Sequence, residues 1–154
     1  MHGGCTCRHV RYRLTDTPLF VHCCHCSWCQ RESGSAFAVN VLIEASNITI
    51  ETGHLSEIKV PSPSGKGQTF ARCPECQIAL WSYYGGSGRK IAFVRGGTLD
   101  DPGRAPPDIH IYTASKQPYV VLPRGIPCKS GYYDRIKLWP EASLKRRKNA
   151  LNRL

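Results

Sequence analysis

The sequence predicts a mainly β domain of short antiparallel strands with one helix at its C-terminal end. Short segments rich in β-branched and aromatic residues recur along the chain, separated by turn-forming stretches in a sequence with 14 glycines and 11 prolines. Only residues 140–154 have the apolar spacing of a long helix. A length of 154 residues fits one domain with a sizeable core.

The expected strands are identified one by one from alternation or from β-branched runs. Residues 10–14 alternate apolar and basic side chains, as a half-buried strand does, and residues 37–43 form a β-branched run. The full set of expected strands is 10–14, 19–22, 37–43, 48–51, 57–60, 68–73, 79–84, 90–94 and 108–112. Residues 27–33 are expected to form a short helical turn, and residues 61–67 and 84–89 are loops by composition.

Residues 140–154 differ from the rest of the chain. Leu144, Leu151 and Leu154 recur there at helical spacing among basic residues, which predicts an amphipathic helix with a solvated basic face. We therefore divide the chain into a zinc-binding domain of residues 1–139, argued from its cysteines below, and a basic helix or tail of residues 140–154. Alternative interpretations of Lys145–Lys148 are a nucleic-acid contact and a nuclear localisation signal.

The charge balance and the N-terminus restrict the function classes. A net charge of +10, from 21 basic and 11 acidic residues, favours anionic partners, either nucleic acid or small acidic metabolites. The N-terminal MHGGCTC lacks the apolar core of a signal peptide, and no apolar run approaches the roughly 20 residues needed to span a membrane. We expect a cytoplasmic protein without a membrane segment, in a reducing compartment where clustered cysteines favour metal binding over disulfides.

Eight of the nine cysteines fall into three clusters. These are a C-x-C pair at Cys5 and Cys7, the run CCHCSWC at residues 23–29, and C-P-E-C at Cys73 and Cys76. A C-x-x-C turn lets two thiolates reach one ion at about 2.3 Å each, near tetrahedral geometry. Two such turns with C-x-C pairs beside them strongly indicate a metal site, and the all-sulfur ligand set makes zinc the first choice.

Two divisions of the cysteines are consistent with these spacings. A zinc ribbon would bind one ion through Cys26, Cys29, Cys73 and Cys76. The second scheme uses more of the thiols and binds two zinc ions per chain, one on Cys5, Cys7, Cys73 and Cys76 and the other on Cys24, Cys26 and Cys29. Closed four-ligand sites are structural, whereas three protein ligands and a free position are typical of a catalytic zinc.

Five motifs occur in order along the chain: GGCTCRHVRY at residues 3–12, CHCSWCQRESGSAF at 24–37, CPECQIAL at 73–80, GGTLDDP at 96–102 and IHIY at 109–112. Together they resemble the glutathione-dependent formaldehyde-activating enzyme family, which also includes centromere protein V. The resemblance implies a zinc-stapled β-tent fold. It also implies a structural zinc on Cys5, Cys7, Cys73 and Cys76 and an active-site zinc on Cys24, Cys26 and Cys29.

The chain departs from the family pattern at several positions without losing a ligand. Arg8 and Gln77 stand where the family usually has glycine after each cysteine pair. Gln30 precedes Arg31 where the family often has two arginines, and residues 117–120 lack a tryptophan that is common near the end of the last motif. These changes affect the expected substrate more than the metal sites.

Three thiolates make zinc a poor activator of water but leave it able to accept a fourth, soft sulfur ligand. We therefore expect a zinc-dependent carbon–sulfur lyase of the S-hydroxymethylglutathione synthase type, with glutathione or a similar thiol, and an aldehyde or thiol adduct, as partners. Arg31 is expected to hold a substrate carboxylate. His25 and His110 are further candidates for proton transfer, although a structural role is expected for His110.

A second function class stays open at the level of sequence. The net charge and the basic tail also suit a zinc-stabilised nucleic-acid-binding or chromatin-associated module without catalysis. A zinc deaminase is excluded, because the H-x-E and P-C-x-x-C signature of that class is missing.

Overall fold

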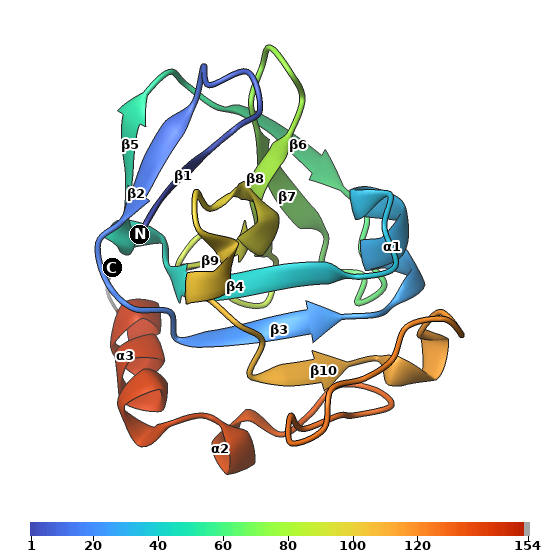
Figure 1. Ribbon diagram of the computed structural model, residues 1–154. Helices are drawn as coiled ribbons and strands as arrows, with labels where there is room; N and C mark the ends of the chain where they lie inside the picture. Colours follow the sequence, from blue (N-terminus) through green and yellow to red (C-terminus); the bar gives the residue numbers. More distant parts are fainter. Residues whose placement is uncertain (153–154) are drawn as a thin grey trace.

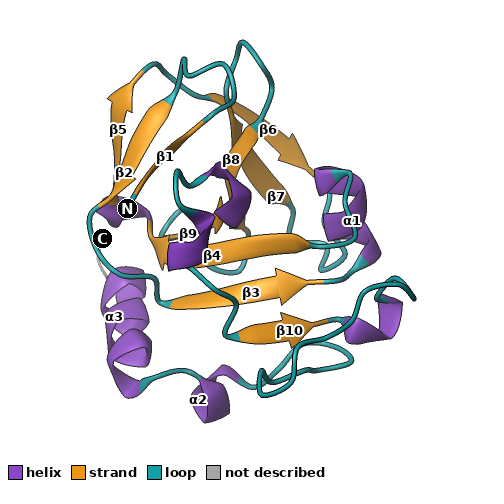
Figure 2. Ribbon diagram, viewed as in Figure 1, coloured by secondary structure: helices purple, strands orange, loops and turns teal. Residues whose placement is uncertain are grey.

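The computed structural model describes residues 1–152, and these residues form a mainly β fold (Figures 1 and 2). The strands are β1 (His2–Gly4), β2 (Arg11–Leu14), β3 (Phe20–Cys24), β4 (Ala38–Glu44), β5 (Ile48–Thr52), β6 (Ser56–Val60), β7 (Gln68–Arg72), β8 (Ala79–Tyr84), β9 (Ile91–Arg95) and β10 (Ile109–Ile111). The α-helices are α1 (Ser27–Ser33), α2 (Arg135–Leu138) and α3 (Glu141–Asn152). The predicted fold class, short strands with a C-terminal helix, is confirmed.

The strands form two sheets (Figure 1). A three-stranded sheet has the order β1-β2-β5, and a seven-stranded sheet has the order β10-β3-β4-β9-β8-β7-β6. Neighbouring strands are antiparallel except β10 and β3, which run parallel with Ile111 opposite Cys24. Strands β3, β4 and β9 therefore lie side by side, and their alternating residues face the two sides of the larger sheet.

One side of the larger sheet packs against the three-stranded sheet. Tyr12 of β2 meets Trp81 of β8 edge to face at 5.5 Å between ring centroids, and Val41, Ile43 and Val94 are buried in the same cluster. This core fixes the two sheets relative to each other, because large apolar side chains from both are removed from water there.

The other side of the larger sheet packs against the C-terminal part of the chain. Phe20 of β3 stacks on Trp139 at 5.4 Å between centroids, and Leu42 and Ile91 belong to the same buried cluster. Ala150 of α3 is 8% exposed and contributes to this cluster. The predicted C-terminal helix is therefore present and covers the sheet, and Leu154 lies outside the described residues.

The solvated face predicted for the basic tail is only partly present. Lys145 and Lys148 of α3 are exposed, whereas Arg146 reaches back to the carboxylate of Glu44 and Arg147 lines a cavity. The run that we interpreted as a nucleic-acid contact thus has two of its four side chains turned toward the protein. In the described part of the chain no helix is long and apolar enough to span a membrane.

Candidate metal centres and the adjoining cavity

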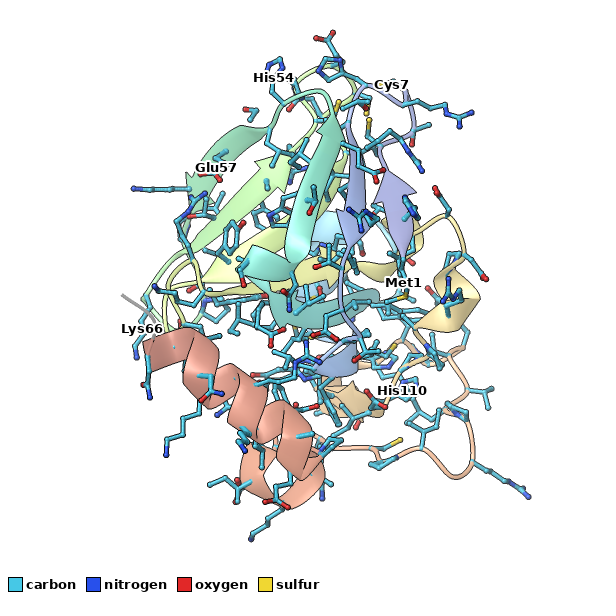
Figure 3. The ribbon with its side chains drawn as sticks, turned by 90° about the vertical axis from the view of Figure 1, so that its left-hand side faces the viewer. Met1, Cys7, His54, Glu57, Lys66 and His110 are labelled. Atoms are coloured by element: carbon cyan, nitrogen blue, oxygen red, sulfur yellow. The ribbon has the colours of Figure 1, made fainter. Side chains whose placement is uncertain are left out.

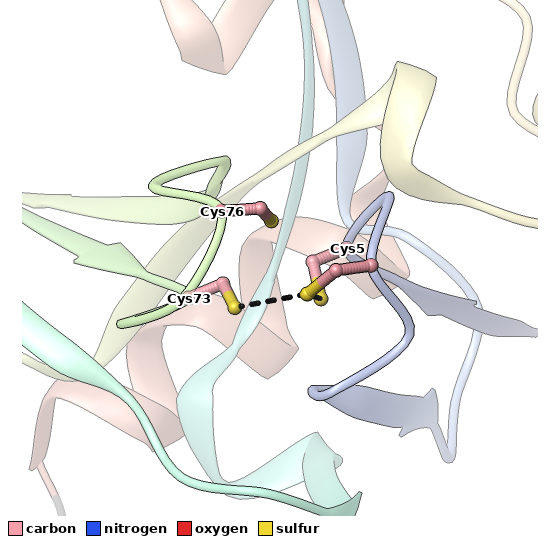
Figure 4. A group of neighbouring side chains, drawn as sticks. Cys5, Cys73 and Cys76 are labelled. Carbon is pink, nitrogen blue, oxygen red and sulfur yellow. Dashed lines mark hydrogen bonds between the residues drawn. The ribbon is translucent and has the colours of Figure 1, made fainter.

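The first and third cysteine clusters of the sequence meet in space (Figure 4). Cys5 and Cys7 lie on the turn between β1 and β2, and Cys73 and Cys76 lie on the turn between β7 and β8. Their four Sγ atoms all lie within 4.8 Å of one another, with 3.5 Å between those of Cys5 and Cys7 and 3.7 Å between those of Cys7 and Cys73. The two turns thus present one compact group of four thiols.

Each of these turns closes through a residue in the left-handed conformation. Arg8 has φ of 64° and donates its backbone N–H to the Cys5 carbonyl at 3.1 Å. Gln77 has φ of 60° and donates in the same way to the Cys73 carbonyl at 3.1 Å. These are the two positions where the family pattern has glycine, which adopts this conformation without a steric cost.

The middle cluster of the sequence forms a second group of thiols. Cys24 ends β3, Cys26 precedes the first turn of α1, and Cys29 lies on that turn. Their Sγ atoms lie within 4.8 Å of one another, and those of Cys24 and Cys26 are 3.4 Å apart. The Cys26 Sγ also caps the helix by accepting the Cys29 backbone N–H at 3.3 Å. The end of β3 and the start of α1 therefore position these three thiols together.

The thiols of the three-cysteine group are unequal as acids. Hydrogen bonds from Cys24 and then Cys29, followed by backbone N–H groups at the start of α1, lower the pKa of Cys26. The hydrogen bond that Cys24 makes to Cys26 is the first cause that raises the pKa of Cys24. The backbone N–H groups at the start of α1 thus favour the thiolate form of Cys26, as a helix N-terminus does for cysteine generally.

Both thiol groups suit a zinc ion by donor type and spacing. A tetrahedral ion with metal–sulfur bonds of about 2.3 Å separates its sulfur ligands by about 3.8 Å. The sulfur–sulfur distances of 3.4–3.7 Å given above are close to this value. The ribbon pairing is not formed, because the Cys26–Cys29 pair and the Cys73–Cys76 pair belong to separate groups.

A cavity of about 580 Å³ opens beside the three-cysteine group, and Cys24 and Cys26 form part of its wall. The floor of the cavity is one side of the larger sheet. Successive side chains of a strand point to opposite sides, so every second residue of a strand faces the cavity. The floor residues are His22 of β3, Asn40 and Leu42 of β4, Tyr84 of β8, Ile91 and Phe93 of β9, and Ile111 of β10. The opposite wall comes from the segment after β10, including Tyr132, Arg135, Trp139 and Arg147.

Residues near the three-cysteine group in sequence differ in whether they line the cavity. Trp28 lines the cavity, whereas Trp81 is buried in the core between the two sheets. Arg31 is exposed on α1 and is not among the residues that line the cavity. The cationic side chains that do line it are Lys66, Arg135 and Arg147.

His25 and His110 form a buried pair away from the cavity lining. The rings stack with centroids 5.2 Å apart, and His25 Nε2 and His110 Nδ1 are 2.9 Å apart, a hydrogen bond. Cys23 Sγ lies 3.6 Å from His25 Nε2 and is buried. Figure 3 shows His110 and Cys7 at well-separated levels of the molecule. This cluster therefore belongs to neither thiol group.

Sequence reasoning missed His22 and Tyr133. Trp139 Nε1 donates to the Tyr133 hydroxyl at 2.6 Å, and the Tyr133 hydroxyl is 2.5 Å from His22 Nε2. Burial, with the nearby charge of Arg135, lowers the pKa of His22 to about 3, so the ring is neutral at physiological pH. The available clue was the position of His22 two residues before Cys24 on the same strand face.

Comparison with known proteins gives a matching family model and a similar solved structure. Residues 1–115 match the family model described as "Glutathione-dependent formaldehyde-activating enzyme". A crystal structure of a Rhodobacter sphaeroides protein matches with a TM-score of 0.49 and 18% sequence identity, over 84% of this chain and 99% of that chain. The family match covers both groups of thiols and ends before the segment that forms the outer wall of the cavity.

Proposed function

This chain belongs to the glutathione-dependent formaldehyde-activating enzyme family, and from that premise we propose that it is a zinc-dependent carbon–sulfur lyase. The reaction is of the S-hydroxymethylglutathione synthase type, in which a thiol and an aldehyde combine reversibly. We assign two zinc ions per chain, a structural one to Cys5, Cys7, Cys73 and Cys76 and an active-site one to Cys24, Cys26 and Cys29.

The observation that carries this proposal is the position of the three-cysteine group at the wall of the 580 Å³ cavity. Three protein ligands leave a tetrahedral ion one position for an outside ligand, and Cys24 and Cys26 both face the space where that ligand would enter. The four-cysteine group has no such vacancy and joins two distant turns, which suits a structural role.

The chain's own residues have separable roles in the reaction. Cys24, Cys26 and Cys29 hold the metal, and the apolar floor at Leu42 and Phe93 excludes water from it. Breakdown of a hydroxymethyl thiol adduct leaves the bonding electron pair on sulfur, forms the aldehyde carbonyl and releases the hydroxyl proton. A bound zinc ion supplies stabilisation of the sulfur as a thiolate.

Arg31 was expected to bind a substrate carboxylate, and its exposed position on α1 does not support that role. We propose Lys66, Arg135 and Arg147 instead, because these three cations line the cavity. Figure 3 shows Lys66 beside α3, the helix that carries Arg147.

No observation in the described part of the chain favours the nucleic-acid-binding alternative. Arg146 is held by Glu44 and Arg147 lines the cavity, so the basic run of α3 is only partly free to contact a phosphate backbone. A cytoplasmic location stays a prediction. It agrees with nine cysteines that form no disulfide.

The test is an assay of adduct formation and breakdown with glutathione and formaldehyde, on protein loaded with zinc. We expect Cys26→Ser to abolish turnover, and Cys128→Ser, at an exposed cysteine outside both groups, to retain it. Full activity of Cys26→Ser, or of metal-free protein, would contradict the proposal.

A further inference from the structure

We propose that the thiol accepted by this chain is carried by a molecule with an aromatic or otherwise apolar body and an anionic group, rather than by a wholly polar peptide such as glutathione. The inference rests on the proposed function, because it assumes that the substrate sulfur reaches the three-cysteine group. It concerns the remainder of the substrate, which the cavity beside that group must accommodate.

Aromatic rings contribute to several sides of the cavity. Tyr84 and Phe93 lie edge to face on its floor, with centroids 4.7 Å apart. Tyr112 and Tyr132 lie opposite, with centroids 6.2 Å apart, and Trp28 stands next to the cysteines. Such surfaces bind apolar and aromatic groups by burial and by ring–ring contact, and a volume of about 580 Å³ is that of a small-molecule site.

The side chains of Asn40 and His22 on the floor are already used within the protein. Asn40 Oδ1 accepts from Arg95, and Asn40 Nδ2 lies 3.5 Å from the Ala38 carbonyl. His22 Nε2 is paired with the Tyr133 hydroxyl. The amide groups of a peptide placed over Asn40 and His22 would find little hydrogen-bonding capacity at these two side chains, which is unfavourable.

All the charged side chains among the described residues that line the cavity are positive. Lys66, Arg135 and Arg147 are there, and no aspartate or glutamate is. Within residues 1–152, Arg147 donates to the Ser87 hydroxyl at 3.4 Å and to no carboxylate, and Arg135 lies over the Trp139 ring at 5.7 Å. Burial lowers the pKa of Arg147, and the charge of Arg135 lowers it further.

This differs from several arginines elsewhere in the fold, which are paired with carboxylates. Arg11 is paired with Asp100, Arg72 with Glu32, and Arg89 with Glu57. A cavity with unpaired guanidinium groups favours an anion in it. Glutathione would also bring an ammonium group, which would meet three cations and no acidic side chain of the lining.

The wall that makes this selection lies outside the family match. Tyr132, Arg135, Trp139 and Arg147 follow residue 115, where the match ends. The family match therefore covers the cysteine groups, the sheet and the lining residues up to Tyr112, and leaves out the four side chains of this outer wall.

Calorimetric titration of the zinc-loaded full chain tests the inference with four probes. These are para-(mercaptomethyl)benzoate, glutathione, benzyl mercaptan, which lacks the anion, and para-toluate, which lacks the sulfur. We expect para-(mercaptomethyl)benzoate to bind at least about tenfold more tightly than each of the other three. Its formaldehyde adduct should also turn over with a lower KM than the glutathione adduct.

Substitutions of the cations that line the cavity test where the anionic group of the ligand binds. Arg147→Met should remove the advantage of para-(mercaptomethyl)benzoate over benzyl mercaptan, and Arg135→Met should reduce it, while neither changes benzyl mercaptan binding. Lys148→Met is the matched control, because Lys148 is exposed on the same helix and does not line the cavity. Circular dichroism and a thermal melt establish that each variant is folded before titration.

The outcomes separate this inference from the function on which it rests. Binding and turnover of glutathione at least as good as those of the aromatic thiol would overturn the inference and leave the lyase proposal standing. Binding of para-toluate as tight as that of para-(mercaptomethyl)benzoate would also overturn it, because the sulfur would then contribute nothing. Failure of every thiol to bind would overturn the lyase proposal and the inference together.

Discussion

Arg146 of α3 donates to both carboxylate oxygens of Glu44 at the end of β4, with 2.9 Å from Nε to Oε1 and 2.6 Å from Nη2 to Oε2. The Glu44 side chain is 9% exposed and that of Arg146 is 25% exposed, so the pair is largely withdrawn from water. Arg146 Nη1 also donates to the Thr17 carbonyl at 3.0 Å. This bidentate ion pair attaches the C-terminal helix to the end of strand β4 in the larger sheet.

We expect Arg146→Met to lower the free energy of unfolding by about 2–3 kcal/mol, because it leaves the Glu44 carboxylate buried without its main partner. Urea denaturation measures the change. Lys148→Met, at an exposed position of the same helix, should stay within about 0.5 kcal/mol of the parent. Equal, small effects of both substitutions would mean that the helix is a solvated tail.

The tail shows where sequence reasoning stops. The leucine spacing predicted the helix, and α3 begins one residue after the expected start. The sequence did not show which basic side chain turns inward, because Glu44 lies 102 residues away along the chain. Residues 145–148 are all basic, so their residue types do not indicate which side chain faces the protein. Only the position of the helix on the sheet distinguishes Arg146 from Lys145.

Metal analysis of the purified, zinc-loaded protein should give two ions per chain. Under increasing chelator one ion should leave first, from Cys24, Cys26 and Cys29, because that group offers one thiolate fewer and adjoins a cavity. Cys26→Ser should reduce the content toward one, and Cys128→Ser should leave it at two. Loss of both ions in a single step would argue against separate sites.

Substitutions in the two groups should differ in their effect on folding. Cys5→Ser and Cys76→Ser should unfold the domain or make it insoluble, because a structural zinc contributes its binding free energy to folding. Cys26→Ser should leave a folded protein without activity. Thermal melts of the three variants provide the comparison, and equal destabilisation by all of them would refute the division into structural and active-site groups.

Arg8→Gly should stabilise the protein. Arg8 has φ of 64°, a conformation that costs an L-residue roughly 1–2 kcal/mol, and glycine avoids that cost. The larger entropy of glycine in the unfolded chain offsets part of the gain. We expect a net gain of about 0.5–1 kcal/mol, or about 2–4 °C in Tm.

Arg8→Ala is the control for this substitution, because alanine removes the same exposed side chain but keeps the unfavourable conformation. The difference between the glycine and alanine variants isolates the backbone contribution. A Tm of Arg8→Gly at or below that of Arg8→Ala would show that the turn is not strained.

Tyr133→Phe should destabilise the wall of the cavity. The substitution removes the hydroxyl that joins Trp139 Nε1 to His22 Nε2 and leaves two buried polar atoms without partners. We expect a loss of about 2–3 kcal/mol in the free energy of unfolding, measured with urea. Tyr119→Phe, at a side chain that is 74% exposed, should change it by less than about 0.5 kcal/mol.

Most of the strands were predictable from the local sequence, because alternating apolar and polar residues and β-branched runs indicate strands directly. Each expected strand is present within about two residues at its ends, and α1 has the predicted bounds. The missed strand, β1, has the sequence HGG, which carries no strand propensity and is held by its pairing with Arg13, Tyr12 and Arg11.

The thiol groups were predictable in part and the cavity was not. Ligand spacing alone left two divisions of the cysteines open, and the resemblance favoured the one in which the thiols converge. The cavity depends on which residues after β10 return to the sheet, and nothing local in Tyr132 or Trp139 indicates that return. Arg31 was chosen because it is near the cysteines in sequence, whereas the lining cations Arg135 and Arg147 come from distant segments.

The cavity has its sulfur-binding corner and its outer wall on different stretches of the chain, the cysteines within the first 29 residues and the wall after residue 115. On the proposed function, changes downstream of residue 115 should alter this outer wall while the cysteine ligands stay unchanged. Relatives with identical cysteine motifs are expected to differ in the thiols they accept wherever their C-terminal segments differ.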